Sequence, residues 1–297
     1  MSAASETSHV SACEETLSFV VTTGDRVSQA QFDECASFSA TTTAYGAPSC
    51  LFRKPGNRVK MNVAKFKGQL IPDDPATTVL ATCRAGDSLL GHAFATTWIY
   101  ESSHKLDHDD SRGTAKAGWI TQLVVDKSCR RRGIATELLQ SLLVSEPFQN
   151  VSVLGVASSH PATCAALAKI AHVPIGALDL DFTRTHARDI LARTPIYYLK
   201  GAALHGSLFG GDHPPGAVCS IFTQFHVDHE EPLGVLRTFQ NANRWFLGEL
   251  HEGYEFLVVV PMTATTRWPR EPAFARAWSS GHLLLTRDFT SPLTRSH

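Results

Sequence analysis

The feature that most constrains the fold of this chain is an apolar strand that is followed, within a few residues, by a helix that begins at a glycine. Residues Trp119 to Asp126 have the apolar character of a strand buried inside a sheet. Three consecutive arginines follow at 130–132, and Gly133 comes next. The residues after it place their apolar side chains on one stripe of an amphipathic helix: Ile134, Leu138, Leu139, Leu142 and Leu143. The spacing therefore predicts a strand, a tight basic turn and a helix that starts at the glycine.

This basic turn has the properties of a site for a diphosphate. Gly133 lacks a Cβ, so the backbone can approach a ligand closely there. The first N–H groups of a helix have no partner within it, and the helix dipole adds partial positive charge at the same end. We therefore expect the turn to bind a pyrophosphate. The P-loop pattern GxxxxGK[ST] is absent, and no strand is followed by GxGxxG, which leaves coenzyme A as a leading candidate.

The turn resembles a signature of the GNAT N-acetyltransferases, in which Q/R-x-x-G-x-G/A joins a strand to a helix. Here the pattern reads Arg130-x-x-Gly133-x-Ala135, after a strand that ends in Leu-Val-Val. The wider sequence pattern, which includes GHAFA, WITQLVV and RRRGIA, resembles that of an uncharacterised fungal branch of the family. The resemblance implies an α/β fold, mixed α+β, in which a mostly antiparallel sheet splays apart between its fourth and fifth strands.

The same resemblance assigns roles to backbone groups. It implies that amides around Leu123, Val124 and Val125 hold the pantetheine and the thioester carbonyl of acetyl-CoA, the cosubstrate. It also implies that the pyrophosphate is held by the turn and the first helical residues, namely Arg130, Arg131, Arg132, Gly133, Ile134, Ala135 and Thr136.

The residues available to transfer protons differ from those of the family pattern. The family often has a carboxylate near the fourth strand and a tyrosine on the fourth helix. Residues 119–125 contain no carboxylate, and Ala168 stands where the tyrosine would be. His160 and His92 are the leading catalytic candidates, because imidazole titrates near neutral pH. The alternatives are that His160 bonds its own loop at a helix start and that His92 is a hydrogen-bonded strand residue. Weaker candidates are Cys164, Asp126, Tyr197 and Tyr198.

Further elements are expected on both sides of the turn. The periodicity predicts strands at 17–22, 78–83, 89–100 and 151–156, and helices at 28–39, 161–171 and 182–191. The weaker C-terminal pattern predicts strands at 196–199, 218–227 and 256–260, a helix at 232–246, and polar loops at 101–118 and 206–216.

These elements suggest a division of the chain. We expect a disordered lead at 1–13, a GNAT core at 14–200, an extension at 201–262 and a tail without clear pattern at 263–297. The extension either supplies the last strands of the sheet or forms a separate unit.

Composition excludes several classes of protein. The formal net charge of −1 and the absence of a basic stripe argue against a nucleic-acid partner. No apolar run reaches the roughly 18 residues that a membrane span needs. Seven cysteines without CxxC pairs predict reduced thiols in a cytoplasmic protein. The His and Asp residues at 104–110 are expected to be a solvated loop, so no metal site is predicted.

The sequence therefore predicts an acyl-CoA-dependent N-acyltransferase. The most favoured reaction is direct attack of a primary amine on acetyl-CoA within a ternary complex. The alternative is a catalytically silent acyl-CoA-binding regulatory module, which the missing tyrosine and strand carboxylate motivate. The sequence does not define the acceptor amine or the oligomeric state.

Overall fold

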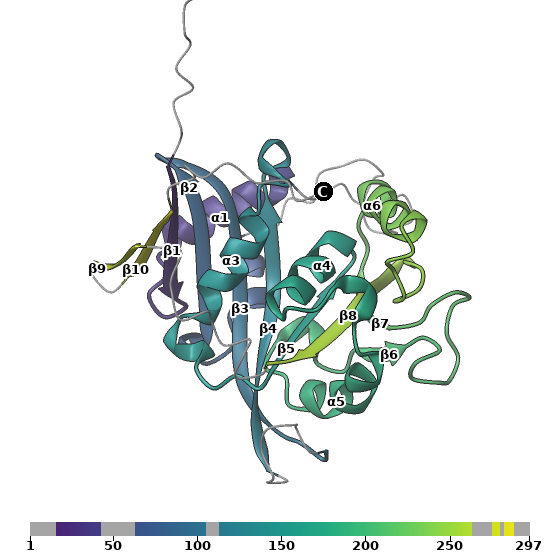
Figure 1. The fold of residues 1–297 in the computed structure, drawn as a ribbon. Helices are drawn as coiled ribbons and strands as arrows, with labels where there is room; N and C mark the ends of the chain where they lie inside the picture. Colours follow the sequence, from purple (N-terminus) through teal and green to yellow (C-terminus); the bar gives the residue numbers. More distant parts are fainter. Residues whose placement is uncertain (1–15, 43–62, 105–112, 263–274, 280–281, 288–297) are drawn as a thin grey trace, which may run out of the picture.

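The part of the chain that the structure describes is built around one sheet of ten strands. The computed structural model describes residues 16–42, 63–104, 113–262, 275–279 and 282–287. Within them the strand order is β6-β7-β8-β5-β4-β3-β2-β1-β10-β9 (Figure 1). Strands β4 and β5 pair in parallel, and all the other neighbours pair antiparallel. The expectation of a mixed α/β fold with a mostly antiparallel sheet is confirmed.

The strands are rich in β-branched and aromatic residues, which fit a pleated surface. Their bounds are β1 Leu17–Thr23, β2 Thr78–Ala85, β3 Ser88–Glu101, β4 Thr114–Val125, β5 Val153–Ser158, β6 Ala203–His205, β7 Ser220–Phe225, β8 Gly253–Pro261, β9 Ala275–Ser279 and β10 His282–Arg287. The α-helices are α1 Gln29–Thr42, α2 Val63–Leu70, α3 Ile134–Leu143, α4 Pro161–Ile170, α5 Leu180–Ala192 and α6 Glu230–Asn241.

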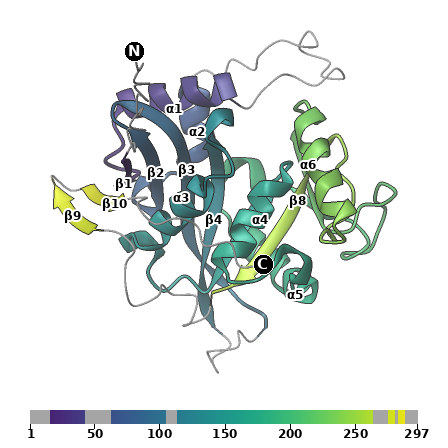
Figure 2. The same cartoon turned by 45° about the horizontal axis from the view of Figure 1, so that its top comes forward.

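Helices cover both faces of the sheet. Helices α3 and α4 lie on one face, and α1 and α2 lie on the other (Figures 1 and 2). Side chains alternate between the faces along a strand. On β3, Phe94 packs against Phe32 of α1 and Phe66 of α2, whereas a Cβ on Gly91 would meet Leu138 of α3. The alternation along β3 thus supplies two separate apolar layers.

The sheet opens between β4 and β5. The parallel pairing runs only from Ala117↔Val153 to Ile120↔Val156. Beyond that point β4 remains paired with β3 as far as Val125, and β5 remains paired with β8 as far as Ser158. The β3–β4 register also shifts beside Thr121, so one extra residue is inserted into β4 there. Such a bulge bends its strand, and the β4–β5 gap begins beside it.

The structure corrects parts of the sequence reading. The predicted strand at 196–199 is wrong, because Tyr197–Leu199 forms a 3-10 turn, η5, after Pro195. The predicted loop at 101–118 is too long, since β4 already begins at Thr114. Strands β9 and β10 lie in the segment predicted to lack a pattern, and β10 pairs with β1. The strands predicted at 218–227 and 256–260 are present as β7 and β8. The expected lead at 1–13 lies outside the described residues.

A substitution at the parallel β4–β5 contact tests how tightly the side chains pack at the base of the gap. Gly155 on β5 lies under the buried ring of Trp119, and an added Cβ would lie 2.3 Å from that ring. We expect Gly155→Ala to lower the free energy of unfolding by about 1–3 kcal/mol, measured by chemical denaturation. Gly234→Ala on α6 is the control, because its added Cβ meets no atom within 4 Å. That variant should gain about 0.5–1 kcal/mol, and an equal loss in both variants would contradict the packing argument.

Candidate active site

The basic turn between β4 and α3 has a left-handed backbone at two positions. Arg131 has φ 64° and Gly133, which precedes the helix, has φ 85°. Asp126 fixes the start of the turn by accepting a 2.8 Å hydrogen bond from the Ser128 N–H. Hydrogen bonds from Ser128 hold the pKa of this carboxyl below its usual range, so Asp126 acts as a turn cap. Left-handed residues in a turn are typical of backbone nests that bind anions.

The amides of this turn are free to bind a ligand. Within the described chain, the N–H groups of residues 130–136 have no hydrogen-bond partner, and the first bonded amide is that of Glu137, which donates to the Gly133 carbonyl at 3.1 Å. A Cβ added to Gly133 would meet no atom within 4 Å. Open space and unpaired donors therefore coincide at the positive end of a ten-residue helix. This combination fits the diphosphate of coenzyme A.

The open edge of β4 continues this surface. The Asp126 N–H donates to Leu90 on β3 at 2.9 Å. Successive amides of a strand point to opposite edges. The N–H groups of Leu123 and Val125 therefore point away from β3, into the β4–β5 gap. The side chain of Val124 is buried, and Val124 pairs with His92.

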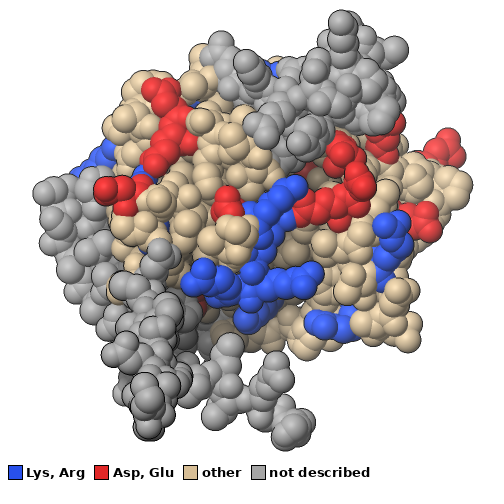
Figure 3. Space-filling model, turned by 90° about the horizontal axis from the view of Figure 1, so that it is seen from above, with Lys and Arg blue, Asp and Glu red and all other residues tan. Residues whose placement is uncertain are grey.

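An acidic residue of α6 lies across the arginines. Glu231 forms ion pairs with Arg130 and, at 3.2 Å, with Lys127. Arg130 also donates through Nε to the Val125 carbonyl at 3.1 Å, which folds its side chain back over the end of β4. Seen from above, Lys and Arg side chains meet Asp and Glu side chains on this face (Figure 3). Sequence reasoning missed Glu231, because nothing local links α6 to the turn.

His160 lies at the start of α4 beside the same network. Its Nδ1 accepts a 3.2 Å hydrogen bond from the Ala162 N–H, and its Nε2 lies 3.6 Å from a Glu231 oxygen. Burial, together with the Arg130 charge, lowers its pKa to about 4. This geometry fits the alternative role of His160, in which the residue starts a helix and its side chain forms a hydrogen bond within its own loop.

His92 lies on the opposite side of the sheet, fully buried against α1. Its Nε2 lies 3.0 Å from Gln122 Oε1 and 3.3 Å from Ser39 Oγ. Burial lowers its pKa to about 4, so the imidazole is neutral at physiological pH. His92 and His160 are therefore not brought together, and each is a weak base.

The weaker candidates take separate positions. Cys164 is fully buried, and burial raises its thiol pKa. Tyr197 is 73% exposed, whereas the Tyr198 hydroxyl donates to the Thr121 carbonyl at 3.5 Å beside the gap. Sequence reasoning missed Glu255, a buried carboxylate on β8, because the predicted strand began one residue later. A single carboxylate within an otherwise apolar strand was the available signal.

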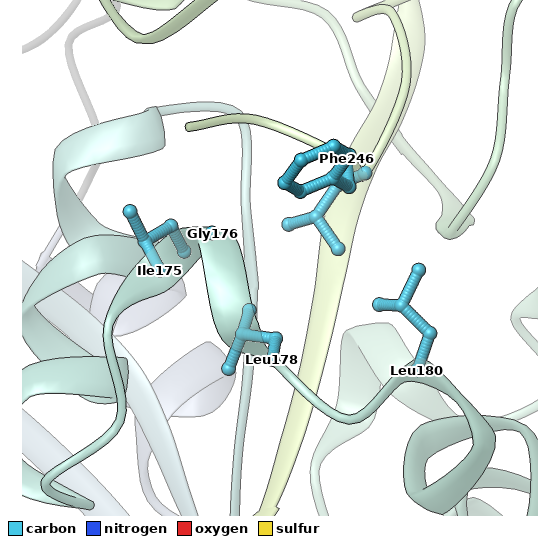
Figure 4. Close-up of a pocket in the computed structure, with 6 residues that line it drawn as sticks. Ile175, Gly176, Leu178, Leu180 and Phe246 are labelled. Carbon is cyan, nitrogen blue, oxygen red and sulfur yellow. The ribbon is translucent and has the colours of Figure 1, made fainter. Parts of the chain in front are cut away.

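A separate apolar cavity lies away from these groups. Its volume is about 360 Å³, and Figure 4 shows side chains that line it. The lining residues are Ile175, Gly176, Leu178, Leu180, Phe246 and Leu247. None of them carries a titratable side chain, so this cavity offers no group that could transfer a proton.

Comparison with protein families agrees with this geometry. Residues 50–170 match the Acetyltransferase (GNAT) family. The match covers less than half of the chain, and it identifies this segment as a GNAT acetyltransferase domain. The matched segment contains β4, the basic turn, α3, β5 and α4. A comparison with curated protein sequences finds no match.

Comparison with solved structures finds acetyltransferases at low sequence identity. A mutant agmatine N-acetyltransferase in its apo form is 9% identical, with a TM-score of 0.40, and the match covers 82% of this chain and 99% of that one. The NatC complex bound to Gag peptide and CoA is 14% identical, with a TM-score of 0.33 and coverage of 51% and 82%. An aminoglycoside acetyltransferase from an uncultured soil metagenomic sample, bound to sisomicin, is 11% identical, with a TM-score of 0.31 and coverage of 47% and 76%.

None of the helices in the described ranges has the length and apolar character that crossing a bilayer requires. The described residues also contain no group of three or more His, Cys, Asp or Glu side chains arranged to hold a metal ion.

The buried imidazole of His92 gives a testable pH dependence. Its pKa is lowered from 6.5 to about 4 in the folded protein, so between these values the unfolded chain binds a proton that the folded chain does not. The free energy of unfolding should therefore fall as the pH drops from about 6.5 to about 4, by about 3 kcal/mol from this residue. His92→Gln should flatten this part of the stability profile, measured by urea denaturation. The exposed His213→Gln is the control, and an unchanged profile in His92→Gln would contradict the prediction.

Proposed function

We propose that this protein transfers an acetyl group from acetyl-CoA to a primary amine by direct attack in a ternary complex. The observation that carries the proposal is the row of unpaired backbone amides at residues 130–136, open to solvent at Gly133. Those amides would hold the pyrophosphate, and the outward amides of Leu123 and Val125 would hold the pantetheine arm and the thioester carbonyl. GNAT enzymes use these two classes of substrate, and the family match supports the reaction class.

The reaction mainly requires that the protein position the two substrates and polarise the thioester carbonyl. A strand amide that points into the β4–β5 gap can stabilise the negative charge that develops on the thioester oxygen. Holding amine and thioester in line replaces an encounter between two separate molecules and supplies much of the rate. No covalent intermediate on the protein is needed.

A silent acyl-CoA-binding module remains the second candidate. The observation in its favour is that both histidines predicted for proton transfer have lowered pKa values, near 4, and separate positions. Calorimetry with acetyl-CoA and with CoA tests binding, and release of CoA thiol in the presence of amines tests turnover. Binding with no thiol release would favour the silent module, and the absence of binding would contradict both functions.

The first variant tests the turn directly. We expect Gly133→Val to weaken CoA binding at least about tenfold, or about 1.4 kcal/mol, because a branched side chain would fill the open approach and strain the left-handed backbone. Gly210→Val is the matched control, since Gly210 also has positive φ, 72°, and no atom within 4 Å of an added Cβ. Calorimetry should show wild-type affinity in the control. Equal weakening in both variants would mean that backbone strain alone is responsible.

The second variant tests the acidic residue over the arginines. The Glu231 carboxylate occupies Arg130 and Lys127, so it competes with the phosphates of CoA for the same cations. We expect Glu231→Gln to tighten CoA binding several-fold, with a smaller gain at high salt because the pair is partly exposed. Glu230→Gln, one residue earlier on the same helix, should leave the affinity unchanged. Weaker CoA binding in Glu231→Gln would show that the carboxylate supports the site instead.

A further inference from the structure

Polar groups from three parts of the chain converge on the β4–β5 gap. The Thr121 Oγ1 atom of β4 is buried and has no hydrogen-bond partner within the described chain. The Tyr198 hydroxyl of η5 reaches the Thr121 carbonyl from the sheet face covered by α2, and lies next to the Trp119 side chain. Glu255 of β8 faces Tyr198 closely enough for its charge to affect the phenol. Unsatisfied buried polar atoms are rare in native proteins and call for a ligand or another explanation.

Glu255 is the carboxylate among these groups, and a carboxylate can accept a proton from an amine. It is 7% exposed, and one carboxylate oxygen accepts a 2.7 Å hydrogen bond from the Thr223 hydroxyl of β7. The backbone N–H of Ser159, just beyond the end of β5, also donates to this carboxyl. These bonds hold the carboxylate at the end of β5, where that strand has already parted from β4.

The surroundings of Glu255 favour its action as a base. Burial raises its pKa above the ordinary value, toward the range in which a carboxylate accepts protons efficiently. The titratable groups that interact with it are Tyr198 of η5 and Cys164 of α4. Burial raises the pKa of both, so both stay protonated and neither competes for the proton. No cation among the described residues forms an ion pair with Glu255.

Building on the proposed acetyl transfer, we propose that Glu255 is the general base that accepts the proton of the acceptor amine. The thioester, held from the α3 and α4 face, would place its carbonyl carbon in the gap beside the β4 amides. The amine would enter beside Tyr198 and Glu255, on the other side of that carbon. The amine enters this side in its neutral form, so it has one proton to give up when the amide forms.

The step balances without another reactant. The amine nitrogen attacks the thioester carbon, so a C–N bond forms and the carbonyl electron pair moves to oxygen. Glu255 takes one proton from the nitrogen, the carbonyl re-forms, and the C–S bond breaks to release the CoA thiolate. The proton held by Glu255 then neutralises the thiolate, directly or through water. The products are an amide and CoA thiol.

The experiment compares the full-length protein with Glu255→Gln, using acetyl-CoA and a panel of primary amines. The panel contains an aliphatic diamine, an arylalkylamine, an aminoglycoside and a peptide with a free N-terminus. CoA release measures turnover and calorimetry measures CoA binding. We expect Glu255→Gln to bind CoA like the wild type and to lose at least about 100-fold in kcat. Glu252→Gln, an exposed carboxylate nearby, should keep wild-type turnover.

A second variant, Thr223→Val, gives a measurement that would not change if Glu255 had only a structural role. Thr223→Val removes the hydroxyl that donates to Glu255, so the pKa of the carboxyl rises and the acid limb of the kcat/KM profile should move to higher pH. This test stands even if Glu255→Gln fails to fold. Full turnover in Glu255→Gln, or an unmoved acid limb in Thr223→Val, would overturn the proposal. Wild-type CoA binding without turnover of any amine would also contradict a catalytic base, while loss of CoA binding would overturn the proposed function itself.

Discussion

The separation of β4 from β5 after Ile120 and Val156 is the constraint on which the rest of the site depends. A parallel pair cannot be joined by a tight hairpin, so the chain must cross over through a helix between the two strands. That helix, α3, begins just beyond the end of β4, where ligands bind in open sheets of this kind. The free amides of the turn therefore follow directly on the open edge of β4, so a long, thin ligand could contact both.

The electrostatics of this region are divided between its two ends. At the turn, positive charges lie close to Glu231, so the protein partly neutralises its own anion site. In the gap, Tyr198, Trp119 and Thr121 provide polar atoms without charge, and Glu255 is the buried carboxylate beside them. A highly charged diphosphate fits the first end, and an amine that must lose a proton fits the second. This division of charge supports the proposed acyl transfer between two unlike substrates.

The turn could be predicted because all its determinants are local. Gly133, the arginines and the apolar stripe of α3 lie within one short segment, and each acts through its own backbone or its immediate neighbours. Glu255 and Glu231 could not be placed in this way, because their positions depend on the pairing of β7 with β8 and on the packing of α6 against α4. His160 and His92 were correctly placed after β5 and on β3, but burial and their hydrogen bonds are tertiary properties. The division of the chain at residues 200 and 262 remains a prediction.

The pairing of β10 with β1 has a consequence for the order of assembly. These strands come from opposite regions of the sequence, so their contact closes a very long loop and forms only after most of the chain exists. During synthesis β2 can pair with one edge of β1 early, but the other edge of β1 stays unpaired until β10 has been made. An uncovered strand edge is a template for pairing with other chains. Nascent molecules thus pass through a stage in which one side of the finished sheet is open to association.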